Sequence, residues 1–210
     1  MTIYPSLNKS PKKNLHKIVD TTVKESLTLI NSYSKQVTFV TFSPNGLILA
    51  SLLDKSILKL WDLKTSEHYT LLDRHDSYLT MLDNVAFSPD GLLIAAAMMF
   101  DRVAIWDMQT RERLRLLSGE ANVVAFSPDG LLLASAGKGD IMLRDVKTGE
   151  LVRTLVGHSS TMNHICFCFS PDGCMLASAS DKTVKLWDVG TGVVSTILCK
   201  FFFGDLFKEG

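Results

Sequence analysis

A four-residue turn motif, Ser-Pro-Asp/Asn-Gly, occurs four times in this chain and constrains its fold more than any other feature. The motifs begin at Ser43, Ser88, Ser127 and Ser170, so they are 45, 39 and 43 residues apart. A second landmark, Trp-Asp or once Arg-Asp, follows each motif and recurs at intervals of 45, 38 and 43 residues. Two landmarks with one period of about 40–45 residues indicate an array of repeats, each of which needs its neighbours to bury its apolar residues.

The best-preserved repeat lies between residues 149 and 192. Apolar residues alternate along 165–169 and again along 184–186, in runs that are too short for helices and are bounded by turn residues. Pro171 presets φ for a turn, and Gly173 gives the backbone freedom that a tight hairpin needs. The pattern predicts four short antiparallel strands in each repeat, and therefore an all-β fold.

This repeat resembles a WD repeat, because Gly157-His158, the motif at Ser170, Asp181 and Trp187-Asp188 stand in the order typical of that family. The resemblance covers residues 25–198 and implies a β-propeller of four four-stranded blades. WD propellers usually close with about seven blades, so we expect a partial or open propeller. The expected blades are approximately 25–62, 67–107, 112–145 and 150–188, with an extra strand at 193–198. A polar arm at 1–24 and an apolar tail at 199–210 flank the array.

The resemblance also implies a polar network in the fourth repeat, in which Trp187 donates to Ser178, Ser178 to His158, and His158 to Asp181. The same residue types occur in Ser-His-Asp hydrolases. However, no strained strand-to-helix turn surrounds Ser178, and no oxyanion-binding loop is recognisable. We therefore interpret these four residues as a structural tetrad. No other repeat has all four positions, and Ala96 replaces the serine in the second repeat.

WD repeats imply a non-catalytic scaffold that binds other proteins through its loops. The face formed by the loops between blades and between the second and third strands is the usual contact face in this family. Arg, Tyr and Phe are favoured residue types at interfaces. The candidate partner-binding residues are Arg74, His75, Tyr78, Met99, Phe100 and Arg102. The alternative for Met99 and Phe100 is that they fill space between blades of unequal size.

Three other interpretations of function remain open. The amino-acid sequence of the repeats resembles the propeller regions of fungal signalling proteins that join WD repeats to a nucleotide-binding oligomerisation domain. This resemblance implies that the chain is a sensor or regulatory part of a larger assembly. A truncated or decayed repeat fragment without independent function is the main alternative. An enzyme is disfavoured, because the phosphate-binding, metalloprotease and nucleophile-elbow motifs are absent from the sequence.

Charge and hydropathy limit the partners. The chain has 22 basic and 22 acidic residues, so no overall field favours nucleic acid or an anionic membrane. The first 20 residues lack the apolar core of a secretory signal, and the longest apolar run, Leu92–Phe100, is too short to span a bilayer. We expect a cytoplasmic protein without cofactors. Its partners would be proteins, or further WD repeats that complete the propeller.

The four cysteines are Cys166, Cys168, Cys174 and Cys199, and no CxxC pair occurs among them. His164, Cys166 and Cys168 alternate along a predicted strand with Cys174 nearby, which is an arrangement that could bind a metal. Since both faces of a propeller blade are normally covered, we expect small buried thiols instead, and no metal site.

Overall fold

The computed structural model describes residues 36–72, 82–98, 102–119, 121–137, 139–158, 165–180 and 183–197. These residues form sixteen strands in four antiparallel sheets, which we number 1 to 4 in chain order. Sheets 1 and 2 hold β1 (Val37–Phe42), β2 (Ile48–Leu53), β3 (Ile57–Asp62), β4 (His68–Leu72), β5 (Leu82–Phe87), β6 (Leu93–Met98), β7 (Arg102–Asp107) and β8 (Arg113–Ser118). Sheets 3 and 4 hold β9 (Val123–Phe126), β10 (Leu132–Ala136), β11 (Ile141–Asp145), β12 (Leu151–Leu155), β13 (Cys166–Phe169), β14 (Met175–Ser180), β15 (Thr183–Asp188) and β16 (Val194–Ile197).

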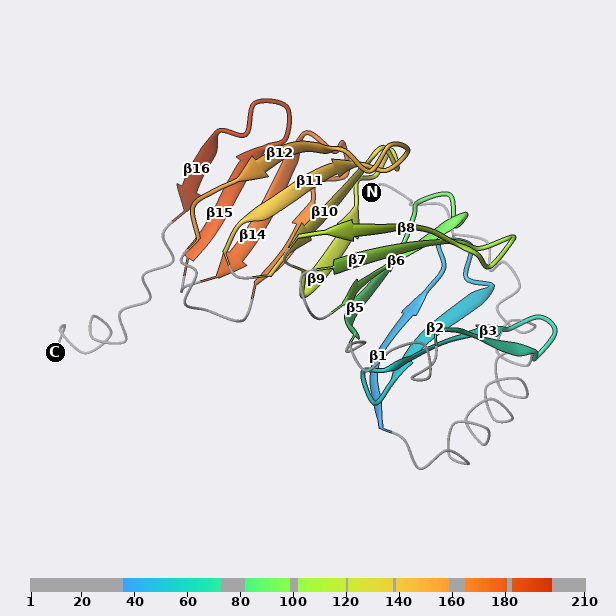
Figure 1. Ribbon diagram of the computed structural model, residues 1–210. Helices are drawn as coiled ribbons and strands as arrows, with labels where there is room; N and C mark the ends of the chain where they lie inside the picture. The colour runs from blue at the N-terminus through green and yellow to red at the C-terminus, as the bar shows by residue number, and fades with distance from the viewer. Residues whose placement is uncertain are drawn as a thin grey trace, which may run out of the picture.

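Each sheet is a simple meander, in which every strand pairs with the next strand along the chain. The first strands of the sheets, β1, β5, β9 and β13, lie side by side in that order. The four sheets follow one another along an arc, with β1 and β16 towards its opposite ends (Figure 1). The predicted all-β fold of four four-stranded units is confirmed. Within the described ranges, no helix is long and apolar enough to cross a membrane.

The sheet boundaries correct the predicted blade boundaries by one strand. The strands at 68–72, 113–118 and 151–155 pair with the strand before them and close the preceding sheet, whereas the sequence analysis placed them at the start of the next blade. The reason is local: a tight turn follows each Trp-Asp or Arg-Asp landmark, as in the bond from the Asp62 N–H to the Glu67 carbonyl, and returns the chain beside the strand it has just left. The extra strand expected at 193–198 is β16, the fourth strand of sheet 4. Residues 1–35 and 198–210 lie outside the described ranges.

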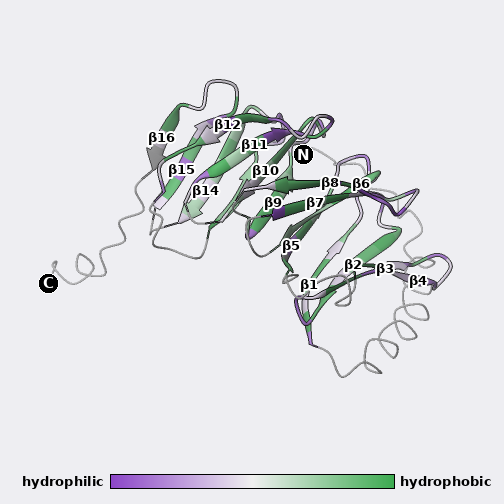
Figure 2. Cartoon of the chain, in the orientation of Figure 1, coloured by the Kyte–Doolittle hydropathy of each residue, from purple (hydrophilic) through white to green (hydrophobic). Residues whose placement is uncertain are grey.

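The hydrophobic core consists of three seams, one between each pair of neighbouring sheets. We call the face of a sheet that points to the next sheet its trailing face, and the opposite face its leading face. In the third seam, Leu143 on the trailing face of sheet 3 packs with Leu176 and Trp187 on the leading face of sheet 4. Apolar residues run along the strands in all four sheets (Figure 2). Complete burial of one leucine contributes about 1.5–3 kcal/mol, so the seams hold the array together.

Candidate interaction surfaces

The four Ser-Pro-Asp/Asn-Gly motifs form the turns between the first and second strands, at one end of each sheet. In the third turn, Asp129 Oδ1 accepts hydrogen bonds from Ser127 Oγ at 2.5 Å and from the Leu131 N–H at 3.0 Å. Ser127 Oγ also accepts the Leu132 N–H at 2.9 Å. The glycine of this turn, Gly130, has a φ of +73°, which favours glycine. The other three turns repeat this hydrogen bonding, so all four are rigid.

Neighbouring turns also contact one another. A Cβ added at Gly91 would lie 3.7 Å from Pro44 Cδ in the turn of the preceding sheet. A Cβ added at Gly130 would lie 3.6 Å from Pro89 Cδ, and a Cβ added at Gly173 would lie 3.5 Å from Pro128 Cδ. These contacts place the turns in a continuous row along one end of the array.

A leucine follows the glycine in three of the four turns and is exposed to solvent. Leu47, Leu92 and Leu131 are 50%, 59% and 65% exposed, and we call these three residues the leucine row. Their backbone carbonyls accept N–H bonds of 2.9 Å from Leu63, Met108 and Val146, which fix the leucines in place. The sequence analysis did not identify them. The signal was present, because a leucine recurs directly after the turn glycine, where a residue outside the core is expected to be polar.

A pocket of about 410 Å³ lies beside Leu131 and between sheets 2 and 3. Leu114 and Arg115 of β8 line it from one side, and Lys147 lines it from the other. Arg115 also donates a hydrogen bond to the Lys147 carbonyl. The leucine row therefore includes one concave region with apolar and cationic groups at its edge.

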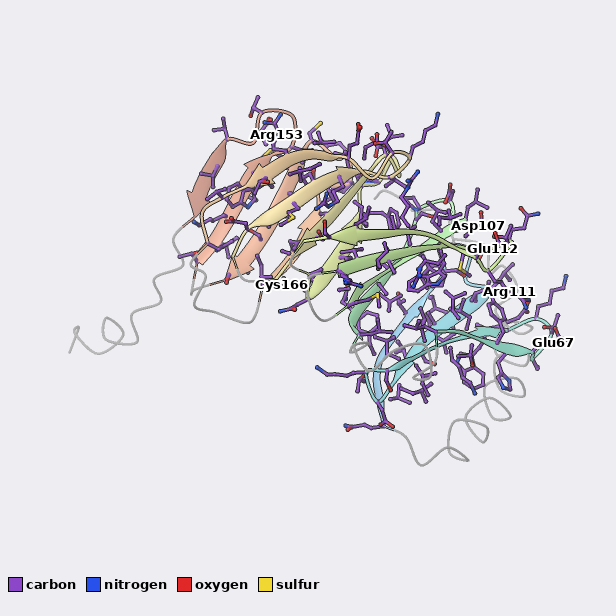
Figure 3. All side chains as sticks on the ribbon, in the orientation of Figure 1. Glu67, Asp107, Arg111, Glu112, Arg153 and Cys166 are labelled. Carbon is purple, nitrogen blue, oxygen red and sulfur yellow. The ribbon has the colours of Figure 1, made fainter. Side chains whose placement is uncertain are left out.

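Side chains on or next to the outer strands contact the neighbouring sheet; two of them, Arg111 and Arg153, are labelled in Figure 3. Between sheets 1 and 2, the Arg111 guanidinium lies 3.8 Å from the centre of the Tyr69 ring, a cation–π contact. Between sheets 3 and 4, Arg153 donates to the carbonyl oxygens of Gly190 at 2.6 Å and Thr191 at 2.8 Å. Each seam thus has an arginine that contacts the neighbouring sheet at the outer edge, in addition to its apolar core.

Of the partner-binding residues predicted from the sequence, Arg102 lies at the end of sheet 2 opposite the turn at Ser88. It is exposed at the start of β7 and pairs across the sheet with Met98 and Ser118. Arg74, His75, Tyr78, Met99 and Phe100 lie outside the described residues, so their role in binding stays a prediction.

The structure contains two of the three hydrogen bonds implied for the structural tetrad. Trp187 Nε1 donates to Ser178 Oγ at 2.8 Å, and Ser178 Oγ lies 2.7 Å from His158 Nε2. Since the indole can only donate, the serine hydroxyl can pass its own proton towards the imidazole. Ser178 is 2% exposed and His158 is 7% exposed, so the network is buried. Asp181 lies outside the described residues.

The other repeats keep only parts of this network. In sheet 1, Trp61 Nε1 donates to Ser51 Oγ at 2.8 Å. In sheet 3, the equivalent Ser135 Oγ is buried without a hydrogen-bond partner among the described residues, because Arg144 occupies the tryptophan position. The Arg144 guanidinium donates instead to the Ser118 carbonyl of the preceding sheet. Burial without a carboxylate lowers the pKa of Arg144.

A sequence comparison with protein families matches residues 24–62 and 149–188 to the family described as "WD domain, G-beta repeat". These segments end at the Trp-Asp landmarks of β3 and β15. Two of the four repeats, those that contain β3 and β15, are therefore matched to the WD40-repeat family. The comparison does not show the resemblance to fungal nucleotide-binding signalling proteins, which stays a prediction.

The WD40 fold is also found by comparison with solved structures. One chain of the structure described as "Crystal Structure of Mitotic Checkpoint Complex" superimposes with a TM-score of 0.67 and 23% sequence identity. The match covers 77% of this chain and 49% of the other, so the WD40 array spans about half the length of that chain. A comparison with curated proteins found no match.

The cysteines of the fourth WD40 repeat are exposed, which contradicts the expected burial. Cys166, Cys168 and Cys174 are all exposed thiols. Cys166 and Cys168 lie on the trailing face of sheet 4, and within the described ranges no further sheet covers that face. Within the described ranges, no three His, Cys, Asp or Glu side chains are grouped so that they could bind a metal ion.

The turn aspartates predict an acid-sensitive stability of the WD40 array. The hydroxyl of Ser127 and the N–H of Leu131 lower the pKa of Asp129 below the ordinary value of 3.8, as the equivalent groups do for Asp90 and Asp172. A depressed pKa in the folded state stabilises the fold above the unfolded-state pKa, and this contribution is lost as the pH falls through the lower value.

We therefore expect Asp129→Asn to lower stability at neutral pH, where the ionised carboxylate contributes, and to reduce the further loss of stability below about pH 4. The first turn shows that an amide fits, because Asn45 Oδ1 accepts the Ser43 hydroxyl at 2.7 Å. Urea unfolding of both proteins at several pH values measures the effect. If the free energy of unfolding of Asp129→Asn fell with decreasing pH as steeply as that of the unaltered protein, Asp129 would not titrate as expected.

Proposed function

We propose that this WD40 array is a non-catalytic scaffold that binds another protein through the leucine row. The observation that carries the proposal is the exposure of Leu47, Leu92 and Leu131 at 50–65% on hydrogen-bonded turns. An aligned set of exposed apolar side chains is typical of a protein-binding surface. Because the turns are already rigid, binding would cost little conformational entropy.

Several other observations support a binding role over catalysis. The WD40 fold is usually non-catalytic. The hydroxyl and imidazole that resemble part of a hydrolase triad, those of Ser178 and His158, are buried, so a substrate could not reach them. The matched solved chain comes from a structure of a protein complex, and the zero net charge of this chain favours a protein over nucleic acid as partner. A cytoplasmic location is part of the same proposal.

The experiment compares proteins captured by three tagged forms of the chain. The test variant carries Leu92→Lys and Leu131→Lys, and the control carries Leu116→Lys and Leu151→Lys. Leu116 and Leu151 are exposed leucines on the outer strands β8 and β12. A protein captured by the unaltered chain and the control is then purified, and its affinity is measured against all three forms.

We expect the test variant to bind this purified protein at least about tenfold more weakly than the control, because apolar anchors dominate interface energies. Equal affinity of the test variant and the control would contradict the assignment of the leucine row as the binding surface.

A further inference from the structure

The trailing face of sheet 4 has the composition of a buried seam but is open. It carries Cys166, Cys168, Ala177, Ala179, Val184 and Leu186. The two cysteines are exposed, and the other four residues are half-buried. The fold thus leaves a set of small and branched apolar side chains exposed or half-buried on this face.

The same positions in sheet 3 show what covers such a face. In sheet 3, Ala134 pairs with Leu143 and Ala136 pairs with Ile141. The equivalent pairs in sheet 4 are Ala177 with Leu186 and Ala179 with Val184. All four residues of sheet 3 are 0% exposed, because the leading face of sheet 4 packs on them. Sheets 1 and 2 bury the corresponding positions in the same way. In the three internal seams, the trailing face of one sheet therefore packs against the leading face of the next sheet.

The leading face of sheet 1 is exposed along β1, whereas Ser51, Lys59 and Trp61 on the same face are only 1%, 6% and 2% exposed. Val40 and Phe42 on β1 are 54% and 61% exposed. Their counterparts in sheet 3, Val124 and Phe126, are 3% and 9% exposed because the trailing face of sheet 2 covers them. The uncovered part of this leading face is therefore its innermost strand.

The row of turns is incomplete at the same two places. A Cβ added at Gly46 would find no atom within 4 Å, whereas the other three turn glycines each lie against a proline of the preceding turn. At the other end of the row, none of the described glycines lies against Pro171. One chain therefore presents an exposed trailing face at sheet 4 and, at sheet 1, an exposed β1 beside a turn glycine with open space around it.

We propose that two copies of this chain associate head to tail, each covering the trailing face of the other's sheet 4 with the leading face of its own sheet 1. A second copy is the occupant because its β1 supplies exposed apolar side chains, Val40 and Phe42, for the exposed trailing face of sheet 4. Two such contacts related by a two-fold axis close a ring of eight sheets, which is within the range of known propellers. A ring without open sheet faces removes the exposed apolar surface from water.

The first measurement combines solution mass with thiol reactivity over a range of protein concentrations. Light scattering is expected to show a species of twice the 23.2 kDa chain mass as the concentration rises. In that species, alkylation of Cys166 and Cys168 by N-ethylmaleimide should slow about tenfold or more, since the thiols lie in the seam. Cys174 is the internal control, because it lies in a turn outside the seam and should react at one rate throughout. Peptide mass mapping assigns each alkylated thiol.

Two seam variants and one control identify the surfaces. Phe42→Asp alters the leading face and Ala179→Asp the trailing face, and both should remain folded monomers at concentrations where the unaltered chain is a dimer. The control variant Leu131→Asp also replaces an apolar residue by aspartate, but outside the seam, and should still form the dimer. Mixing the two seam variants should restore a dimer, because one of its two contacts then joins two unaltered faces.

A monomer with reactive Cys166 and Cys168 at every concentration would overturn the proposal, as would species that grow beyond the dimer, which indicate a contact that does not close. Dimers that persist in both seam variants would place the contact elsewhere. None of these results bears on the leucine row, whose own variants test the proposed function.

Discussion

Replacing Leu143 by alanine is expected to lower the free energy of unfolding by about 2–5 kcal/mol. Leu143 is 0% exposed and lies in the third seam, where it packs with Leu176 and Trp187. The neighbouring sheets cannot close the resulting cavity, because their backbones are fixed by hydrogen-bonded turns on both sides of the seam.

Leu186→Ala is the matched control for this prediction. Leu186 occupies the equivalent position in sheet 4, where it is half-buried because no described sheet covers it. At concentrations where the chain is a monomer, its replacement should cost less than about 1 kcal/mol. Urea unfolding followed by tryptophan fluorescence measures both values. Equal losses in the two variants would show that the trailing face of sheet 4 is already covered in the monomer.

The second large effect is expected from Ser178→Ala. This change removes the group that accepts from Trp187 Nε1 and contacts His158 Nε2, and it leaves both nitrogens buried without that partner. Each polar group left unpaired in a dry interior costs about 1–3 kcal/mol. We therefore expect a clear fall in the denaturation midpoint of this variant.

Ser135→Ala tests the same position in sheet 3, where the serine Oγ has no partner among the described residues. Removing an unsatisfied hydroxyl should leave the stability unchanged within about 0.5 kcal/mol or raise it. Thermal unfolding of the two alanine variants provides the comparison. A destabilisation by Ser135→Ala as large as that by Ser178→Ala would mean that the network is not the source of the effect.

The features that the sequence predicted are those fixed by short-range chemistry. The turn motif at Ser127 predicted a hairpin because its hydroxyl, its aspartate and its glycine act within five residues of one another. The period of the motif predicted four sheets, and the residue types at 178 and 187 implied a hydrogen bond that the structure contains. None of these inferences required knowledge of how the sheets pack.

Packing between sheets decided the rest. Cys168 and Ala86 occupy equivalent positions, and the sequence cannot show that the first is exposed while the second packs in a seam, because exposure depends on whether another sheet follows. The same holds for Phe42 and Phe126.

The sequence by itself determined the repeat and its turns, because these depend on residue types at fixed spacing. Only the tertiary structure decided which sheet each fourth strand joins, that Leu47, Leu92 and Leu131 form a row, and that the faces at the two ends of the array are open. These features arise from contacts between residues about 40 positions apart or more, and such contacts are set by the stacking of whole sheets.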